Sequence, residues 1–353
     1  MREYLYCTST MRGAMWLIAF ILPLIIRLNA SDQCTIDVYS GHSAAVYGLS
    51  SLPSDGDGVR FLSASNDYSI LQWKVGVMDY EGKYVGHTSG VICVAVLGGD
   101  RFISGGYDNK VIVWELGKYS PLKVIGPFHT DAVWAVLDLK DGTALSASDD
   151  KKIIRFNVLT GIKMVTFLEH TNYVKCLALL PDGTFISGSW DNKIKRWDKS
   201  SSTAIETYNF GTFVMTLRVL DSNSFLAAGG SATSSSMKKF KIGTLTAAFT
   251  FSPVHTKQIN SISLLPDLSF VTGGVDGLVL RWVDGRKDPI TNYPGSGAVW
   301  ATANLTDGSL ITGLGNTNIV RYKTNGNFVS LPFSLICDYP VDTADRTPSS
   351  LTK

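Results

Sequence analysis

Histidine, serine and aspartate are the side chains that hydrolases combine into nucleophilic sites, and this chain spaces them regularly. His170 is followed by Ser187 and Asp191, and Trp197 closes the same stretch. A serine nucleophile needs an imidazole base beside it and a carboxylate that orients the base. Hydrolase chemistry is therefore one hypothesis. The other is structural, because an imidazole, a hydroxyl, a carboxylate and an indole can satisfy one another's hydrogen bonds where water is excluded.

The recurrence of this set decides between the two hypotheses. A catalytic triad is needed once, whereas a Ser or Thr, a His, an Asp and a Trp recur here at matching spacing in four units. All five histidines of the chain lie four residues before an apolar anchor residue. We therefore interpret the sets as structural tetrads and expect no catalytic residue, no metal site and no cofactor. The tetrads are His42, Ser63, Asp67, Trp73; His87, Ser104, Asp108, Trp114; His170, Ser187, Asp191, Trp197; and His255, Thr272, Asp276, Trp282.

The elements that must position such a set are short strands. Alternating apolar runs cover Tyr173–Leu180, Phe185–Ser189 and Lys193–Trp197, and turn residues at Pro181–Gly183 and Asp191–Asn192 separate them. Alternation of period two broken by turn residues is typical of antiparallel strands. Three short strands cannot bury their faces alone, so the unit is expected to repeat and stack.

Seven units follow one another along the chain. Successive anchors are 45, 42, 41, 40, 45 and 40 residues apart. This period and the His…Asp…Trp spacing resemble the WD-repeat β-propeller family over roughly residues 35–324. The resemblance implies an all-β fold, a seven-bladed propeller of four-stranded antiparallel blades. The anchors are Val46, Val91, Val133, Val174, Val214, Ile259 and Val299.

Three units depart from the pattern. The third has Phe156 in place of the tryptophan, and the last lacks the histidine. The fifth is the most degenerate: Phe210 replaces the histidine, Ala227 replaces the serine, and Phe240 takes the aromatic position. An insertion, Ser231–Ser236, stands where its aspartate turn belongs.

A propeller must also close its ring. The segment Thr35–Tyr39 precedes the first histidine and has no earlier blade to join. We expect it to pair with the last unit, residues 298–324, so that no strand edge stays open. Phe328–Phe333 is the competing donor of that outer strand.

The residues outside the repeats suggest a three-part chain: residues 1–30 as a signal peptide or signal anchor, 34–330 as the propeller and 331–353 as a partly disordered tail. Arginines precede a thirteen-residue apolar run, Ala14–Ile26, which is too short to span a bilayer comfortably. We expect a cleaved signal, the alternatives being an uncut anchor or a start codon at Met11 or Met15. This predicts a secreted or secretory-pathway protein, cytoplasmic if the segment is not a functional signal, with no other membrane insertion.

The cysteines and one sequon carry hypotheses that depend on export. Cys34 and Cys337 flank the repeats where the ring closes, and a disulfide between them is a hypothesis for an exported chain. Cys93 and Cys176 fall on non-adjacent blades, so we expect buried free thiols. Asn304 begins a glycosylation sequon that only a secretory pathway would use.

Three positions per blade face the top surface in the family that the chain resembles. Tryptophan and tyrosine on such a concave face form binding hot spots, although rings can also pack between blades as spacers. Mixed charges there suit a peptide or folded protein, and a net charge of +2 gives no nucleic-acid footprint. The predicted partner-binding residues are Tyr47, Tyr107, Asp131, Trp134, Asp149, Lys175, Trp190, Lys257 and Trp300.

These observations favour a non-catalytic, monomeric scaffold that binds a protein or peptide on an aromatic top face. The last unit is similar to the closing blade of the ubiquitin-binding propellers in the phospholipase-activating-protein family, which adds a ubiquitin-binding adaptor as an alternative. A propeller enzyme such as a lactonase or glycosidase is a third hypothesis. It would need convergent carboxylates, a metal or a free histidine in the channel.

Overall fold

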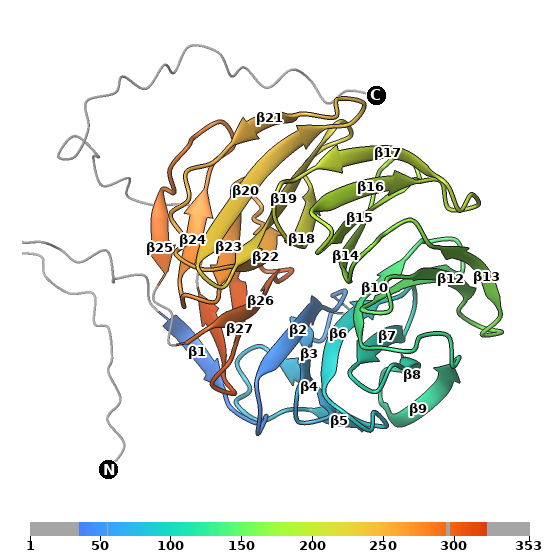
Figure 1. The fold of residues 1–353 in the computed structure, drawn as a ribbon. Coiled ribbons are helices and arrows are strands. Elements are labelled where there is room, and N and C mark those ends of the chain that lie inside the picture. The colour runs from blue at the N-terminus through green and yellow to red at the C-terminus, as the bar shows by residue number, and fades with distance from the viewer. Residues whose placement is uncertain (1–34, 55, 294–296, 323–353) are drawn as a thin grey trace, which may run out of the picture.

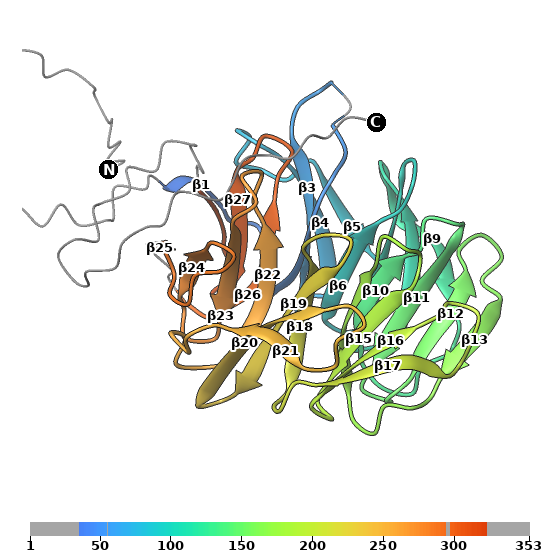
Figure 2. The same ribbon diagram turned by 90° about the horizontal axis from the view of Figure 1, so that it is seen from above.

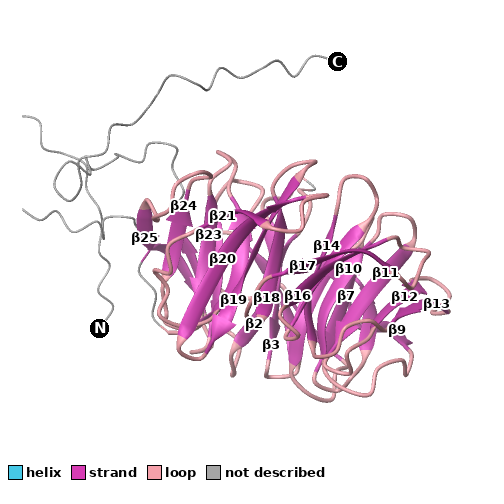
Figure 3. Cartoon of the chain, turned by 45° about the horizontal axis from the view of Figure 1, so that its top comes forward, coloured by secondary structure: helices cyan, strands magenta, loops and turns pink. Residues whose placement is uncertain are grey.

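A computed structural model describes residues 35–54, 56–293 and 297–322 of the protein. Within these residues the chain forms 28 strands joined by turns and loops, without helices (Figure 3). The strands make seven separate four-stranded antiparallel sheets, which are arranged radially around one axis (Figure 1). The predicted all-β, seven-bladed propeller is confirmed.

Each blade begins with its anchor strand nearest the axis. The first six blades are β2 (Val46–Ser51), β3 (Arg60–Ser65), β4 (Ser69–Lys74), β5 (Gly82–Val85); β6 (Val91–Val96), β7 (Arg101–Gly106), β8 (Val111–Glu115), β9 (Lys118–Ile125); β10 (Val133–Asp138), β11 (Thr143–Ser148), β12 (Ile153–Asn157), β13 (Lys163–Phe167); β14 (Val174–Leu179), β15 (Phe185–Ser189), β16 (Lys193–Trp197), β17 (Ala204–Asn209); β18 (Val214–Val219), β19 (Ser224–Ser231), β20 (Ser234–Lys241), β21 (Ala247–Thr250); and β22 (Ile259–Leu264), β23 (Phe270–Gly274), β24 (Val279–Trp282), β25 (Thr291–Tyr293). The last blade holds β26 (Val299–Asn304), β27 (Leu310–Leu314), β28 (Ile319–Tyr322) and β1 (Thr35–Tyr39).

The two ends of the ring share this last blade. Strand β1 pairs antiparallel with β28, with Val38 opposite Val320, so the blue strand lies beside the red ones in Figure 1. Arg321 Nη1 donates to Asp37 Oδ2 at 2.7 Å and links the two strands through their side chains. The prediction that the N-terminal strand closes the ring is confirmed. The competing donor, Phe328–Phe333, lies outside the described residues.

Neighbouring blades are held together by an aromatic layer. In the second blade Phe102 stacks on Trp114 with ring centroids 6.0 Å apart, and Tyr84 of the first blade meets Phe102 edge to face at 4.8 Å. An aromatic side chain of one blade's outer strand thus covers the core of the next blade. Figure 2 shows the blades side by side. Similar trios are Tyr39, Phe61, Trp73; Phe167, Phe185, Trp197; Tyr208, Phe225, Phe240; and Phe251, Phe270, Trp282.

A second polar network lies at the turn between the first two strands of four blades. Arg196 Nε donates to Thr184 Oγ1 at 3.0 Å, and its Nη2 donates to Asp182 Oδ2 at 2.6 Å. We call this network of an arginine, a Ser or Thr and an aspartate the clasp; it was not predicted from the sequence. Its signal is an Asp-x-Ser/Thr turn followed by an arginine directly before the aromatic residue of the third strand. The equivalent arginines are Arg155, Arg281 and Arg321.

Several predictions concern the chain ends. The segment 1–30, the Cys34–Cys337 disulfide and the tail 331–353 lie outside the described residues. Cys93 and Cys176 have free thiols; burial raises the pKa of Cys93 to about 12 and raises that of Cys176 as well. Among the described residues we find no helical segment with the length and hydropathy that a membrane crossing needs.

Candidate functional site

The residues that suggested hydrolase chemistry form closed hydrogen-bonded chains. His170 Nδ1 lies 2.7 Å from Asp191 Oδ2, and its Nε2 lies 2.7 Å from Ser187 Oγ, which also accepts the Trp197 indole N–H at 2.8 Å. The carboxylate only accepts, so Nδ1 carries the proton and Nε2 accepts from the serine hydroxyl. The tetrads of His42, His87 and His255 repeat these contacts at 2.7–3.0 Å.

The tetrad aspartate also fixes two stretches of backbone. Asp191 Oδ2 accepts the Thr171 amide at 3.1 Å, and Oδ1 accepts the Lys193 amide at 3.0 Å. The loop before the first strand is thereby tied to the turn between the second and third strands. We call the end of the propeller formed by these loops and turns the top face. Because Ser187 is fully buried, no substrate reaches its hydroxyl, and the geometry supports a structural role.

The same bonds determine the ionisation of the aspartates. Burial alone would raise the pKa of Asp150, but hydrogen bonds from His129 and from backbone amides outweigh it and bring this pKa to about 2. The carboxylates of Asp67, Asp108 and Asp191 also have lowered pKa values, by the same balance of burial against hydrogen bonds. The pKa of His255 is lowered, chiefly because burial disfavours the imidazolium.

The degenerate blades show what replaces a tetrad. In the third blade His129 Nε2 lies 2.8 Å from Ser146 Oγ, and the pattern stops there because Phe156 has no N–H. In the fifth blade Phe210 is fully buried, and Lys238 Nζ donates to its carbonyl at 2.7 Å. The insertion does not form a broad loop, since its residues extend β19 and β20 to eight residues each.

A repeated β-bulge aims one side chain per blade into the central channel. In all seven blades the register shifts between the anchor and the second residue after it. A bulge leaves the extra residue unpaired and re-aims its side chain. All seven residues at this position line one cavity of about 240 Å³, and we call them the mouth. They are Tyr47, Ile92, Trp134, Lys175, Met215, Asn260 and Trp300.

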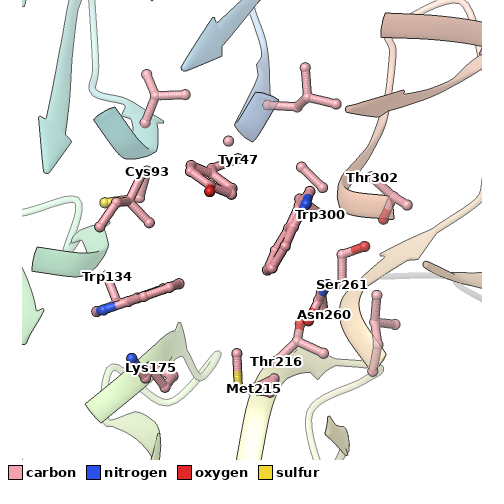
Figure 4. A pocket seen from close by; sticks show the side chains of 16 residues that line it. Tyr47, Cys93, Trp134, Lys175, Met215, Thr216, Asn260, Ser261, Trp300 and Thr302 are labelled. Carbon is pink, nitrogen blue, oxygen red and sulfur yellow. The ribbon is translucent and has the colours of Figure 1, made fainter. Parts of the chain in front are cut away.

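Aromatic rings cover one side of the mouth. Tyr47 meets Trp300 at a centroid distance of 5.1 Å and Tyr107 at 6.2 Å, and Tyr107 meets Trp134 at 5.9 Å, all nearly perpendicular. Figure 4 shows the rings of Tyr47, Trp134 and Trp300 around the opening. These rings are spacers between blades and still partly exposed, with Tyr107 at 37%. Burial raises the pKa of Tyr107, so its hydroxyl stays neutral.

Lys175 and Asp149 do not present free charges to a partner. Lys175 is only 5% exposed, and its Nζ donates to Asp149 Oδ1 at 2.6 Å. The ammonium also lies 3.6 Å from the Trp134 ring centroid and 4.6 Å from that of Trp190. Trp134 Nε1 donates to Asp149 Oδ2 at 2.8 Å, which completes the cluster. The expected exposure of this pair is therefore corrected: the aromatic rings desolvate it, which raises the pKa of Asp149 and lowers that of Lys175.

The remaining predicted residues are spread around this cavity. Trp190 stacks on Phe213 at 4.8 Å and donates its N–H to Met215 Sδ at 3.0 Å, so it supports the mouth. Asp131 and Lys257 are exposed on the top face and do not line the cavity. Ser261 was not among the predicted residues; it lines the cavity, and its buried Oγ has no hydrogen-bond partner among the described residues. Its signal was the uniformly small second position after each anchor.

Within the described residues, no group of three or more His, Cys, Asp or Glu side chains is placed to hold a metal ion.

Comparisons with known proteins agree with the fold. The family described as "WD domain, G-beta repeat" matches residues 33–74, 79–115, 161–198 and 246–282. Each of these stretches ends at, or one residue after, the tryptophan of a complete tetrad. The WD40 β-propeller domain of Doa1, a solved structure, superposes with a TM-score of 0.71 at 20% identity, covering 82% of this chain and 96% of that one. That likeness concerns the fold.

Curated relatives are similar over much of the chain. The U3 small nucleolar RNA-associated protein 15 homolog of Gallus gallus is 27% identical over 233 residues, which are 65% of this chain and 44% of the relative. The ribosome biogenesis protein WDR12 homolog of Chlamydomonas reinhardtii is 25% identical over 276 residues, 73% of this chain and 58% of the relative. The chain thus spans about half the length of these relatives.

These relatives overturn the predicted localisation. Their names point to the nucleolus and to ribosome biogenesis, and secretion was the wrong prediction. The prediction depended on one apolar run, Ala14–Ile26, and a run of that length and hydropathy does not by itself establish export. The disulfide and glycosylation hypotheses lose their basis with it. The four matched WD repeats, the spacing of the tetrads and the seven-bladed ring together show that this chain is a propeller that contains WD repeats.

Proposed function

We propose that this protein is a non-catalytic scaffold whose top face holds a segment of a protein partner within a larger assembly. The observation that carries the proposal is the convergence of all seven bulge residues on one cavity, with rings from three of them around its opening. A concave site of Trp and Tyr side chains anchored on rigid strands is what protein hot spots require.

The chemistry of the channel supports binding without catalysis. The serine or threonine of each tetrad is buried, and its partner histidine is engaged at both ring nitrogens. Lys175 is the charged residue among the described residues of the cavity lining, it is bonded to Asp149 outside the lining, and burial shifts both groups toward their neutral forms. The rings of Trp134, Trp190 and Tyr173 surround the Lys175 ammonium, so this pair is poorly suited to shuttle protons.

The relatives suggest the setting. Their names associate them with a small nucleolar RNA and with ribosome biogenesis, so we infer an assembly of protein and RNA as the partner complex. The expected exclusion of nucleic acid is therefore not kept as part of the proposal. The ubiquitin-binding adaptor stays a prediction.

A site-specific cross-linking experiment tests the top face directly. A photo-reactive phenylalanine analogue replaces Tyr107 on the top face or Tyr119 on the outer rim, which are 37% and 48% exposed. Partner segments captured from extract of the source cells are then identified by mass spectrometry. We expect capture at position 107, and its loss when Trp300→Ala is added to the same chain. Equal capture at position 119, or capture that survives Trp300→Ala, would remove the top face as the site.

A further inference from the structure

We propose that the segment held on the top face is acidic and inserts one uncharged aromatic side chain, with a polar tip as in tyrosine, into the mouth. The inference rests on the proposed function and adds the chemistry of the partner. Two independent observations carry it: the way charge is distributed on the top face, and the residues that line the cavity.

The first observation is a set of free ammonium groups. Lys151 in the turn between β11 and β12, Lys193 at the start of β16, and Lys257 in the loop before β22 are all exposed. Their ammonium groups make no hydrogen bond or ion pair with another described residue. Two more lysines lie nearby, with Lys152 Nζ 3.5 Å from Asp150 and Lys110 Nζ 4.0 Å from Asp108.

The carboxylates of the same loops and turns are mostly below the surface. The tetrad aspartates have side chains only 3–7% exposed, and each is bonded to its histidine and to backbone amides. Asp149 is paired with Lys175 and Glu169 with Lys195, which leaves Asp131 as the exposed carboxylate there without a cation partner among the described residues. A partner in contact with this surface therefore meets ammonium groups first.

The buried carboxylates also limit the attraction of the exposed lysines for anions. They nearly balance the lysines at long range, so the field over the top face is not that of a polyanion-binding groove. Charge complementarity at short range then favours a peptide segment with a few acidic residues over an extended nucleic acid.

The second observation is that no carboxylate is found in the cavity lining among the described residues. Its one charged residue is Lys175, whose ammonium already occupies the Trp134 ring face at 3.6 Å. A cationic side chain entering the mouth would find no carboxylate in this lining to pair with, since Asp149 is already bonded to Lys175. The rings of Tyr47 and Trp300 instead offer apolar and edge-to-face contact to another ring.

On the far wall, beside Asn260 and Thr302, Ser261 carries a hydroxyl that can form a further hydrogen bond. Ser261 Oγ is buried without a partner among the described residues. Figure 4 places Ser261 across the opening from Trp134, with its oxygen turned away from the opening. A buried hydroxyl without a partner is unfavourable, and rotation of the serine side chain about χ1 would bring its oxygen to the polar tip of an inserted ring. This is why tyrosine is favoured over phenylalanine.

The test measures binding of labelled peptides to the full chain by fluorescence anisotropy. The probes are the heptapeptides EDDYDED, EDDFDED, EDDRDED and QNNYNQN, and a twelve-nucleotide poly-uridine RNA. We expect EDDYDED to bind most tightly. The triple variant Lys151→Glu, Lys193→Glu, Lys257→Glu should weaken it about tenfold or more, since each exposed contact contributes only modestly. A matched rim variant, Lys83→Glu, Lys163→Glu, Lys241→Glu, makes the same change in net charge and should leave binding within about twofold.

A second comparison isolates the anchor. Ser261→Ala should abolish the preference for EDDYDED over EDDFDED without changing the binding of EDDFDED. Preference for EDDRDED or QNNYNQN, tighter binding of the RNA, or equal loss in the rim variant would each overturn the inference. Cross-linking at position 107 to neutral or basic segments would overturn it while leaving the proposed function intact, whereas cross-linking at position 119 would remove both.

Discussion

The fourth and fifth blades have the same four-stranded form but differ in almost every polar contact. The fourth, β14–β17, has a complete tetrad around His170 and an arginine clasp around Arg196. The fifth, β18–β21, has neither. Both keep the aromatic trio: Tyr208, Phe225 and Phe240 in one repeat the packing of Phe167, Phe185 and Trp197 in the other. The apolar layer is therefore sufficient for the four-stranded form of a blade, and the polar networks order the loops at the two ends of the blade.

The fifth blade orders its top face by other means. Lys238 Nζ donates to the Phe210 carbonyl, and Ser235 Oγ donates to the carbonyl of His255 in the next blade at 2.5 Å. The bulge is kept as well, so Met215 reaches the mouth as Lys175 does in the fourth blade. The position of the mouth residues thus does not depend on a tetrad in every blade.

Removal of the shared aromatic should have the largest effect on stability. Trp197→Ala and Phe240→Ala each empty a fully buried site, and we expect each to lower the free energy of unfolding by about 4 kcal/mol. Urea unfolding followed by circular dichroism measures both, with Leu268→Ala, at an 80% exposed position, as the control. A small cost for Phe240→Ala alone would contradict the view that both blades depend on one apolar layer.

Loss of the tetrad aspartate should cost less and should act in the fourth blade alone. Asp191→Ala leaves the His170 N–H and two backbone amides without their acceptor, and we expect a loss of about 2 kcal/mol. Hydrogen exchange should show faster opening of the Thr171 and Lys193 amides. The control is Ser235→Ala, which removes one contact in the fifth blade and should cost under about 1 kcal/mol. Equal losses of unfolding free energy in Asp191→Ala and Ser235→Ala would show that the tetrad aspartate stabilises the blade no more than a single hydrogen bond does.

Sequence reasoning succeeded where spacing carries the information. The phase of the histidines and the seven anchors identify the blades, because a repeat is a one-dimensional signal. It failed where a contact joins residues that look like ordinary surface positions. Asp182 and Arg196 are each unremarkable alone, and the burial of Lys175 depends on Asp149 and on rings from two blades. Which charges meet is fixed by the bulge and by packing between blades, and neither is visible in a local pattern.

The pH dependence of stability should differ between the two kinds of blade. Asp191 has a lowered pKa in the folded chain, so the stability that it provides is present above its unfolded pKa of about 3.9 and is lost as pH falls below it. Burial lowers the pKa of His255, so its contribution is present above about pH 6.5 and is lost as pH falls further. Phe210 occupies the same position in the fifth blade and does not titrate.

Two variants separate the pH range in which His255 reduces stability from the range in which Asp191 does. His255→Phe copies the residue of the fifth blade and should flatten the decline of the thermal midpoint between about pH 6.5 and 5. Asp191→Asn should flatten the decline below about pH 4, although it lowers stability at neutral pH. Thermal melts across this pH range measure both effects. Profiles parallel to that of the unmodified chain would show that other groups control its acid sensitivity.

Replacement of the clasp arginine, Arg196, by lysine should have the smallest effect on the free energy of unfolding. It gives the fourth blade the residue type that the fifth blade has at the same position. Arg196 precedes the aromatic of its strand as Lys239 does in the fifth blade, where Lys239 Nζ donates to Asp284 of the next blade at 2.6 Å. Arg196→Lys loses the forked contact to Thr184 and Asp182, because an ammonium cannot donate in two fixed directions as a guanidinium does. We expect a cost of about 0.5–1 kcal/mol, since Asp182 is partly exposed and solvent screens the pair. A double-mutant cycle with Asp182→Asn measures the coupling energy between the two residues. A coupling energy near zero would mean that the clasp does not stabilise the turn. A coupling energy of the expected size would show that the clasp fixes this turn, which in the fifth blade is held by the hydrogen bond between Ser224 and Asp221.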